Sequence, residues 1–390
     1  MKKVKVKLPQ ELIYPHPYIL KSKIIEIDEG IKDGDEVLII NEKNKIIGTG
    51  FYNSSSYKTL RIHTYREFKE LTYEEIKKRI EKAFLNRLLY FDRNESFRVV
   101  FSESDFLTGL IIDKFSDGFV FQINSLGMER KRDLIVKSLK ELFNPLFIYE
   151  KSDGTGRKEE ELPEFKKLHF GNLKNPYLIF TEGLYFLIDI EEGQKTGFFL
   201  DQKINRLKLG KYAKGKICLD LFSYTGGFTL HFLKEEAERV FVVEISEKAI
   251  SLLKENIRIN NFPEKKVKII EGDVFEKIYE IENWKIKFDL IVNDPPSFTH
   301  KKRKKENALR AYKELHSKIF DILNKGGICA TFSCTQAVGI NDLIENLTGV
   351  QKNKEFLIHI KDFLFQSPCH PVSLYFPESF YLKGLVLLKE

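Results

Sequence analysis

Several features that define common protein classes are missing from this sequence. No apolar run approaches the ~18 residues that cross a bilayer, and the N-terminus lacks the apolar core of a secretion signal. The four cysteines form no CxxC pair and no histidine-flanked metal spacing. These absences argue against a membrane, secreted or zinc-binding protein. We therefore expect a cytoplasmic chain with reduced thiols and without a metal.

The length and charge of the chain set further limits. At 390 residues it exceeds the usual size of one domain. Lysine and arginine number 64 against 57 acidic residues, which gives a net charge of +7. This excess is consistent with a polyanionic partner, but also with an ordinary soluble surface.

The most informative segment is 216–228, which reads KICLDLFSYTGGF. Its apolar first half predicts a strand buried in a parallel sheet, and Gly226-Gly227 predicts a tight turn before a helix from Phe228 to about Glu236. A strand, glycine-rich turn and helix in this order place backbone N–H groups under a nucleotide-like ligand at the carboxyl edge of the sheet. We therefore expect the cofactor there.

The type of cofactor follows from departures from better-known loops. Neither the phosphate-binding pattern GxxxxGK[ST] nor the dinucleotide pattern GxGxxG is present. Instead Asp220 lies at the end of the strand, where its charge would repel a pyrophosphate. A carboxylate suits a cationic ligand, and S-adenosylmethionine carries a sulfonium and an ammonium group. The sequence thus predicts S-adenosylmethionine as cofactor.

Acidic residues also lie at or directly after the ends of the next three predicted strands, 239–244, 267–271 and 288–293. Glu244 is placed to accept hydrogen bonds from two ribose hydroxyls. Asp273 and Val274 are placed on either side of an adenine. Asp294 begins an Asp-Pro-Pro motif. A single acid after a strand is usually a helix cap. Four at successive strand ends resemble the class I S-adenosylmethionine-dependent methyltransferases, a Rossmann-like α/β fold. Further candidate cofactor contacts are Phe222, Tyr224, Thr225, Gly226 and Ile245.

Residues 1–66 read as a small β-barrel. Short apolar runs at 4–8, 24–27, 36–41, 45–52 and 59–63 are separated by turn signals such as Asp33-Gly34-Asp35. The stretch GDEVLIINEKNKIIGTGFYN resembles the PUA domain, a compact RNA-binding fold. Small barrels have many uses, so this resemblance gains force only beside the methyltransferase motifs.

Residues 67–174 are expected to form a small α+β middle domain, with helices at 72–90 and 128–142 and strands at 97–101, 109–113 and 119–123. The acidic run 158–164 is interpreted as a solvated loop. The segments FSESDFLTGLIIDKF, YEKSDGTGRKEEEL, EEGQKTGFFLDQKINR, NDPPSF, TFSCT and FPESFYLKG resemble a family of bacterial 23S ribosomal RNA cytosine-5 methyltransferases with an N-terminal PUA domain. This similarity covers nearly the whole chain.

Residues 175–390 are expected to form the methyltransferase domain. A hairpin is predicted at 178–180 and 185–190, a further strand at 327–333, and a final antiparallel pair at 356–360 and 381–388. The segment 191–206 could be an ordinary connecting helix. The resemblance implies that it covers one side of the cofactor, with Gln194, Thr196, Phe199 and Gln202 as contacts.

Cys334 is the candidate nucleophile. Carbon 5 of cytosine is a poor methyl acceptor, and a thiolate that adds to carbon 6 activates it, so such an enzyme needs a cysteine near the methyl group. Cys334 follows the strand 327–333, next to the strand that leads to Asp294. Cys218 and Cys329 lie within strands and are interpreted as inert core thiols.

One departure leaves other functions open. Many related RNA cytosine-5 enzymes have a second cysteine in the motif that holds Asp294, whereas this chain reads Pro295-Pro296-Ser297. Asp-Pro-Pro also occurs in enzymes that methylate an exocyclic amine of guanine or adenine, which remains the alternative. A PUA-bearing RNA-binding protein with an inactive catalytic half is the third interpretation, and a homodimer is left open.

A basic run, HKKRKK, follows the Asp-Pro-Pro motif at 300–305. Like-charge runs are usually solvated surface, but this one lies where the phosphate backbone of a substrate would pass. We expect it to contact RNA, and the resemblance indicates 23S ribosomal RNA. The candidate RNA-binding residues are Lys301, Lys302, Arg303, Lys304, Lys305 and Arg310.

Overall fold

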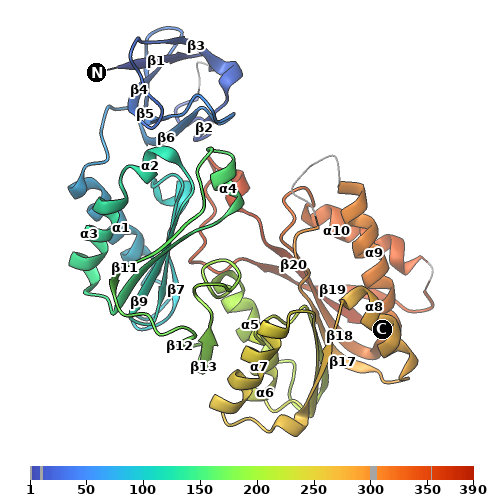
Figure 1. Cartoon of the computed structure of the whole chain (residues 1–390). Helices are drawn as coiled ribbons and strands as arrows, with labels where there is room; N and C mark the ends of the chain where they lie inside the picture. Colours follow the sequence, from blue (N-terminus) through green and yellow to red (C-terminus); the bar gives the residue numbers. More distant parts are fainter. Residues whose placement is uncertain (1, 9–11, 299–304, 353) are drawn as a thin grey trace. The chain divides into compact units, whose positions relative to one another are not determined.

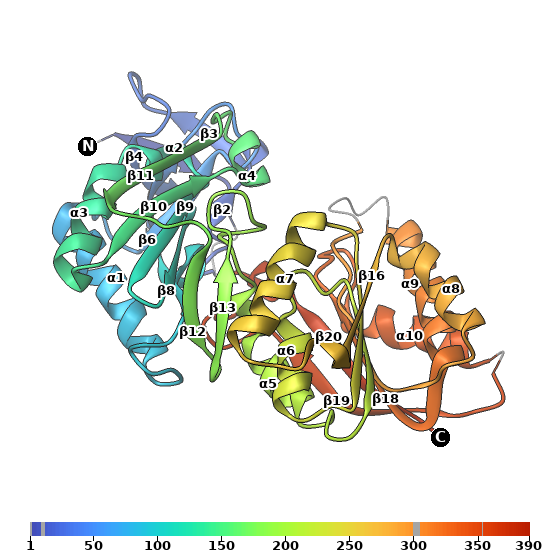
Figure 2. The same cartoon turned by 60° about the horizontal axis from the view of Figure 1, so that its bottom comes forward.

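The computed structural model describes residues 2–8, 12–298, 305–352 and 354–390, and it divides into two compact units (Figures 1 and 2). The first contains Met1–Thr181, Ile188–Leu200 and Pro368–Ser379. The second contains Glu182–Leu187, Asp201–Ser367 and Phe380–Glu390.

The first unit begins with a six-stranded sheet in the order β2-β6-β5-β4-β1-β3. Buried aliphatic side chains such as Val4, Ile39 and Ile62 form its core. The five predicted strands are confirmed to within two residues at each end, whereas the short β2 was not predicted. The strands are β1 (Lys3–Val6), β2 (Tyr18–Ile19), β3 (Ile24–Ile27), β4 (Glu36–Asn41), β5 (Ile46–Tyr52) and β6 (Leu60–Tyr65).

A second sheet of the same unit has the order β11-β10-β9-β8-β7 and carries the packed helices α1 and α3. Thr72 caps α1 by accepting the N–H of Glu75 at 3.3 Å. The elements are α1 (Tyr73–Arg87), β7 (Phe97–Phe101), η2 (Ser102–Asp105), β8 (Leu110–Phe115), β9 (Gly118–Ile123), α2 (Leu126–Glu129), α3 (Arg132–Phe143), β10 (Phe147–Ser152), α4 (Thr155–Lys158) and β11 (Phe165–Gly171).

Two sequence predictions for this region are wrong. The single helix expected over 128–142 is two helices, because the backbone of Lys131, with ψ 4°, leaves the helical conformation between α2 and α3. The run 158–164 is not simply a solvated loop, since Glu160 is buried. Its carboxylate forms an ion pair with Arg61 at 2.9 Å and accepts a hydrogen bond from the Asn53 side chain at 3.0 Å. A buried carboxylate needs such partners.

The second unit is built on a seven-stranded sheet in the order β16-β15-β14-β17-β18-β20-β19. The strands from β16 to β18 are parallel, and β20 is antiparallel to both neighbours. The four predicted parallel strands are confirmed at their stated residues. The strands are β14 (Ile217–Leu221), β15 (Arg239–Glu244), β16 (Val267–Glu271), β17 (Phe288–Asn293), β18 (Leu323–Ser333), β19 (Ile358–Phe365) and β20 (Lys383–Lys389).

The C-terminal part of this sheet differs in detail from the prediction. β18 begins at Leu323 rather than Gly327, directly after α9. The final antiparallel pair is confirmed, but β20 lies between β18 and β19, so of these two strands β19 alone is at an edge of the sheet. The hairpin predicted near 178–190 is the two-stranded sheet of β12 (Tyr177–Thr181) and β13 (Leu184–Ile188).

Helices cover both faces of the seven-stranded sheet (Figures 1 and 2). The carboxyl ends of its parallel strands therefore meet at one edge, where the connecting loops are free to form a site. No helix within the described ranges is long and apolar enough to cross a membrane. One face carries α5 (Lys203–Gly210), α6 (Gly227–Lys234) and α7 (Glu247–Ile259), and the other carries α8 (Val274–Asn283), α9 (Lys305–Ile322) and α10 (Ile340–Gln351).

Candidate active site

The loop between β14 and α6 forms the first part of the site. Phe222, Tyr224 and Gly226 all have positive φ angles, 62°, 50° and 86°. At Gly226 a side chain would also place its Cβ 2.2 Å from Leu253 Cδ1, so only glycine fits. The N–H of Phe222 donates to Val243 O at 3.1 Å. The loop is thereby held at the carboxyl end of β15.

Asp220 lies under this loop and is buried. Its Oδ2 accepts the Thr229 hydroxyl at 2.6 Å and the Thr229 N–H at 3.1 Å. Burial raises the pKa of Asp220 to about 7; the Thr229 hydrogen bonds oppose this, and the charges of Asp294 and Glu244 add to it. Asp220 Oδ1, Ser223 Oγ and Thr225 Oγ1 are buried without a hydrogen-bond partner among the described residues. Such atoms suit a polar, cationic ligand.

Glu244 at the end of β15 organises two loops. Its Oε2 accepts the N–H of Tyr224 at 2.8 Å, and its Oε1 accepts those of Ile245 at 2.9 Å and Ser246 at 2.8 Å. The Ile245 side chain is exposed. The carboxylate is therefore fixed in position at the edge of the sheet, as an acceptor for ribose hydroxyls would have to be.

Asp273, after β16, is the N-cap of α8. Its side chain accepts the N–H of Phe275 at 2.8 Å. Asp273 is exposed, while Val274 beside it is buried. Asp273 thus has the helix-capping role that is usual for a single acid after a strand, and the apolar Val274 lies next to it.

The end of β17 places Asp294 beside the segment that follows β13. Asp294 Oδ2 accepts the side-chain amide of Gln202 at 3.0 Å, and Gln202 in turn accepts Asn205 at 2.6 Å. Of the four cofactor contacts implied for 191–206, Gln202 is therefore joined to the Asp-Pro-Pro motif within the second unit.

A buried network of polar side chains connects the end of β17 to the neighbouring elements. The sequence did not indicate this network. Asn293 donates to Thr331 Oγ1 at 3.0 Å, and His316 Nε2 lies 2.9 Å from the same hydroxyl. His316 Nδ1 lies 3.1 Å from Asn346. Burial lowers the pKa of His316 to about 4, so the ring is neutral at physiological pH. This hydrogen-bond network links β17, β18, α9 and α10.

Cys334 lies one residue beyond β18 and next to the Asp-Pro-Pro motif. Its Sγ is 4.0 Å from Pro295 O, and its side chain is partly exposed. The other strand cysteines differ: Cys218 and Cys329 are buried, and burial raises the pKa of both thiols. Among the cysteines of the parallel sheet, Cys334 is thus the accessible one.

Lys383 lies beside Cys334 and was not assigned a role from the sequence. It pairs with Ser333 in the β18–β20 register and is only 4% exposed. Its ammonium donates to Thr335 O at 3.0 Å and forms no ion pair with the described residues. Burial lowers the pKa of Lys383, and the charges of Cys334 and Asp342 oppose this. The sequence signal for this residue is a lysine directly before the apolar run GLVLL of the strand KGLVLLK.

The remaining predicted residues belong to the first unit or to the basic run and α9. Gln194, Thr196 and Phe199 belong to the first unit, where the buried Thr196 hydroxyl donates to Asp113 at 2.5 Å. Of the basic run, Lys301, Lys302, Arg303 and Lys304 fall outside the described residues. Lys305 pairs with Asp342 at 2.7 Å, and Arg310 is exposed on α9. No cluster of metal-ligand type occurs in the described part of the chain.

This edge of a doubly wound sheet, with acids at successive strand ends, defines a Rossmann-like methyltransferase domain. Residues 167–370 match the family model of S-adenosylmethionine-dependent methyltransferases, and residues 3–65 match that of the PUA-like domain. Ribosomal RNA large subunit methyltransferase I of Tolumonas auensis is 34% identical over 97% of this chain and 96% of its own. The protein of that name from Aeromonas hydrophila is 33% identical, with the same coverage. The chain belongs to the family of these S-adenosylmethionine-dependent methyltransferases.

Solved structures share the fold along the full length. A protein assigned as a SAM-dependent methyltransferase from Streptococcus mutans superposes with a TM-score of 0.83 at 18% identity and covers 100% of both chains. A second protein, assigned as a methyltransferase and crystallised with SAH, gives a TM-score of 0.85 at 20% identity, again with complete coverage. S-adenosylmethionine is the cofactor, and the unpartnered buried oxygens beneath the β14–α6 loop fit a ligand of that charge.

Proposed function

We propose that the protein methylates carbon 5 of a cytosine in the large-subunit ribosomal RNA, with Cys334 as nucleophile. The names of the full-length relatives support ribosomal RNA as substrate, and the PUA-like domain supports RNA binding. The observation that carries the chemistry is a partly exposed thiol next to the Asp-Pro-Pro motif with a buried ammonium beside it.

The site residues divide between cofactor and base. We assign Asp220, Glu244 and Asp273, with the β14–α6 loop, to the cofactor, which supplies an electrophilic methyl group when bound. Cys334 adds as thiolate to carbon 6 of the cytosine, and carbon 5 becomes nucleophilic toward that methyl group. After methyl transfer, loss of the carbon 5 proton restores the 5,6 double bond and expels the thiolate. Asp294 is placed to hold the cytosine ring nitrogen and amino group.

The ammonium of Lys383 gives this proposal a physical basis. A thiolate is the reactive form of cysteine, and a neighbouring positive charge favours it. A buried lysine without a carboxylate partner is costly, so negative charge on Cys334 would also stabilise Lys383. We therefore assign Lys383 as a positioning residue that stabilises the thiolate.

The test uses ribosomal RNA that contains 5-fluorocytidine. Fluorine at carbon 5 cannot leave as a proton, so the thiol adduct should persist and appear as a covalent protein–RNA complex that requires the cofactor. Cys334→Ala should abolish both the adduct and turnover on native RNA. Cys329→Ala, which removes a buried strand thiol, is the matched control and should retain the adduct.

Methylation of an exocyclic amine is the second candidate, and the Asp294-Pro295-Pro296 motif favours it. That reaction needs no nucleophilic thiol. Full activity of Cys334→Ala on native RNA, with 6-methyladenosine or a methylated guanine in the digested product, would replace the cytosine mechanism by this alternative.

A further inference from the structure

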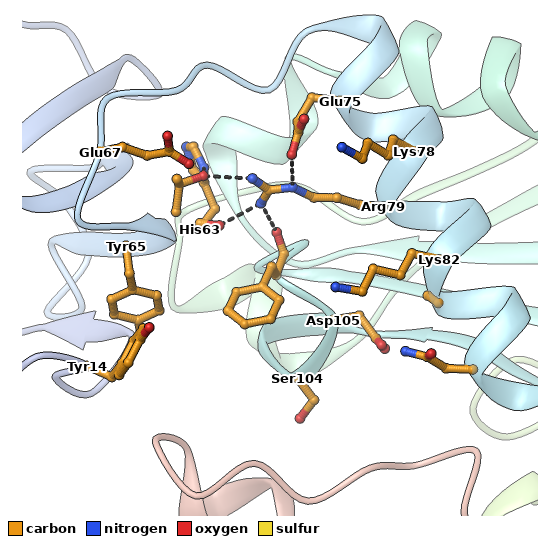
Figure 3. Close-up of a pocket in the computed structure, with 14 residues that line it drawn as sticks. Tyr14, His63, Tyr65, Glu67, Glu75, Lys78, Arg79, Lys82, Ser104 and Asp105 are labelled. Atoms are coloured by element: carbon orange, nitrogen blue, oxygen red, sulfur yellow. Dashed lines mark hydrogen bonds and ion pairs between the residues drawn. The ribbon is translucent and has the colours of Figure 1, made fainter.

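A cavity of about 450 Å³ lies in the first unit, far along the chain from the residues of the methyltransferase site. Its walls come from the end of β6, the exposed side of α1, the turn η2 and Tyr14 (Figure 3). Residues of the PUA-like sheet and of the middle domain therefore both line it. This volume is in the range of small-ligand sites.

Arg79, Glu75 and Asp105, three charged residues of the lining, are already engaged in hydrogen bonds and ion pairs. The guanidinium of Arg79 donates to Glu75 Oε1 at 2.8 Å, to the carbonyls of His63 and Phe106 at 2.5 and 2.7 Å, and to the Thr64 hydroxyl at 2.7 Å. Asp105 accepts two bonds from Arg87. These groups hold α1, β6 and η2 together and are not available to a ligand.

Two lysines of the lining are open to a ligand. Lys78 and Lys82 lie one helical turn apart on α1, are exposed, and form no ion pair with the described residues. Figure 3 shows both side chains extending from α1 toward the side where Tyr14 and Tyr65 lie. Glu67 is the single carboxylate of the lining without a described ion-pair partner. The balance of these three charges around the cavity is therefore positive.

Aromatic rings form the other side. Phe106 and Tyr14 are 39% and 57% exposed, and Tyr14 packs edge-on against Tyr65 at 5.5 Å between ring centroids. Phe106 is fixed, because Arg79 holds its carbonyl and the Tyr375 ring stacks on it at 5.5 Å and 24°. An exposed, rigid ring next to available ammonium groups is the usual combination for unpaired nucleotides.

We propose that this cavity binds single-stranded RNA, with a base stacked on Phe106 and the flanking phosphates held by Lys78 and Lys82. The inference rests on the proposed function in that RNA is the substrate, and it adds a second binding site that is separate from catalysis. An unpaired strand is favoured over a duplex, because only unstacked bases can present a face to a ring inside a concave site.

The test measures binding of the full-length protein to a fluorescein-labelled single-stranded RNA of about ten nucleotides, at several salt concentrations. Lys78→Ala/Lys82→Ala should weaken binding by about ten-fold and reduce the slope of log affinity against log salt by about 1.4, or about 0.7 for each phosphate that is no longer neutralised. Lys137→Ala/Lys140→Ala removes the same charge from exposed positions on α3 outside the cavity and should leave the slope unchanged. An equal weakening in both double variants would overturn the proposal.

The stacking arm is independent of charge. Phe106→Ala should weaken binding by about ten-fold with an unchanged salt slope, whereas Phe106→Trp should bind like the wild type. If every cavity variant binds RNA normally while the 5-fluorocytidine adduct still forms, the cavity assignment is wrong and the proposed function stands. If the wild type does not bind the ten-nucleotide RNA, the cavity assignment is likewise wrong, whereas absence of the 5-fluorocytidine adduct on ribosomal RNA would sink the proposed function. Displacement of RNA by an equal concentration of polyglutamate would assign the cavity to an acidic protein and overturn the proposal.

Discussion

The carboxylate of Glu244, the last residue of β15, accepts the backbone N–H of Tyr224, which lies in the loop after β14, at 2.8 Å. The same carboxylate accepts two N–H groups of its own loop. One side chain thus fixes the β14–α6 loop relative to the end of β15. A ligand that contacts both loops meets an arrangement that is already in place, which lowers the entropy lost on binding.

Glu244→Ala should weaken S-adenosylmethionine binding by about 1.5–3 kcal/mol, because a charge-assisted acceptor is removed and the loop is released. Titration calorimetry on the folded variant measures this change. Glu247→Ala removes an exposed carboxylate from the first turn of α7 and is the matched control. Unchanged affinity of the Glu244 variant would show that the cofactor does not depend on this strand end.

Asp220 predicts a proton-linked binding step. Because its pKa is raised to about 7, about half of the molecules carry a neutral carboxyl at pH 7. A cationic ligand favours the ionised form, so binding should release about half a proton at pH 7 and weaken as the pH falls below 7. Calorimetry in buffers of different ionisation enthalpy measures the released proton.

Asp220 should also make the stability of the protein depend on pH, in the direction opposite to that of cofactor binding. Its native pKa lies above the ordinary value of ~3.9, so the native state binds more protons, and stability should decrease as the pH rises from about 4 to about 7. Asp220→Asn should remove both the proton release and this slope. A wild-type protein that binds the cofactor without releasing a proton at pH 7 would contradict the assignment of Asp220.

The parallel strands could be predicted to the residue because each is a short apolar run with an acid at its end, which is local information. The positions of Asp220, Glu244, Asp273 and Asp294 at one edge then follow from parallel topology alone. The turn at Gly226 could also be predicted from the sequence, since glycine favours the positive φ that the turn needs there.

What could not be predicted depends on contacts between distant residues. Glu160 reads as one of several acids in a polar run, and only its pairing with Arg61, 99 residues away, explains its burial. The placement of β20 between β18 and β19 brings Lys383 beside Cys334, and no local pattern encodes that order.

The basic run after the Asp-Pro-Pro motif is expected to contribute to RNA affinity. Replacing Lys301, Lys302, Arg303 and Lys304 by Ser should weaken binding to ribosomal RNA and reduce its salt dependence, because fewer counterions are released. Cofactor affinity should not change. Lys305→Ser is expected to add little, since Lys305 pairs with Asp342 at 2.7 Å. A salt slope equal to that of the wild type would show that the run is solvated surface.

The proximity of Lys383 to Cys334 gives a prediction that needs neither RNA nor cofactor. The rate of Cys334 alkylation by iodoacetamide, followed by peptide mass mapping across a pH series, reports the thiolate fraction. Lys383→Met should shift the midpoint of this curve upward by about one pH unit or more, because an opposite charge at close range is removed. Tyr312 and Asp342 also interact with this pair of groups and are unchanged in the variant.

Two further variants separate charge from structure. Lys383→Arg keeps a positive charge and should keep the midpoint near that of the wild type. Lys389→Met removes the other lysine of β20, whose ammonium donates to the carbonyls of Phe320 and Leu323 at the opposite end of the strand, and should leave the midpoint unchanged. If Lys383→Met alkylates with the wild-type midpoint, Lys383 does not stabilise the thiolate. In that case its burial beside Cys334 serves packing alone, and the adduct assay would still decide the role of Cys334 itself.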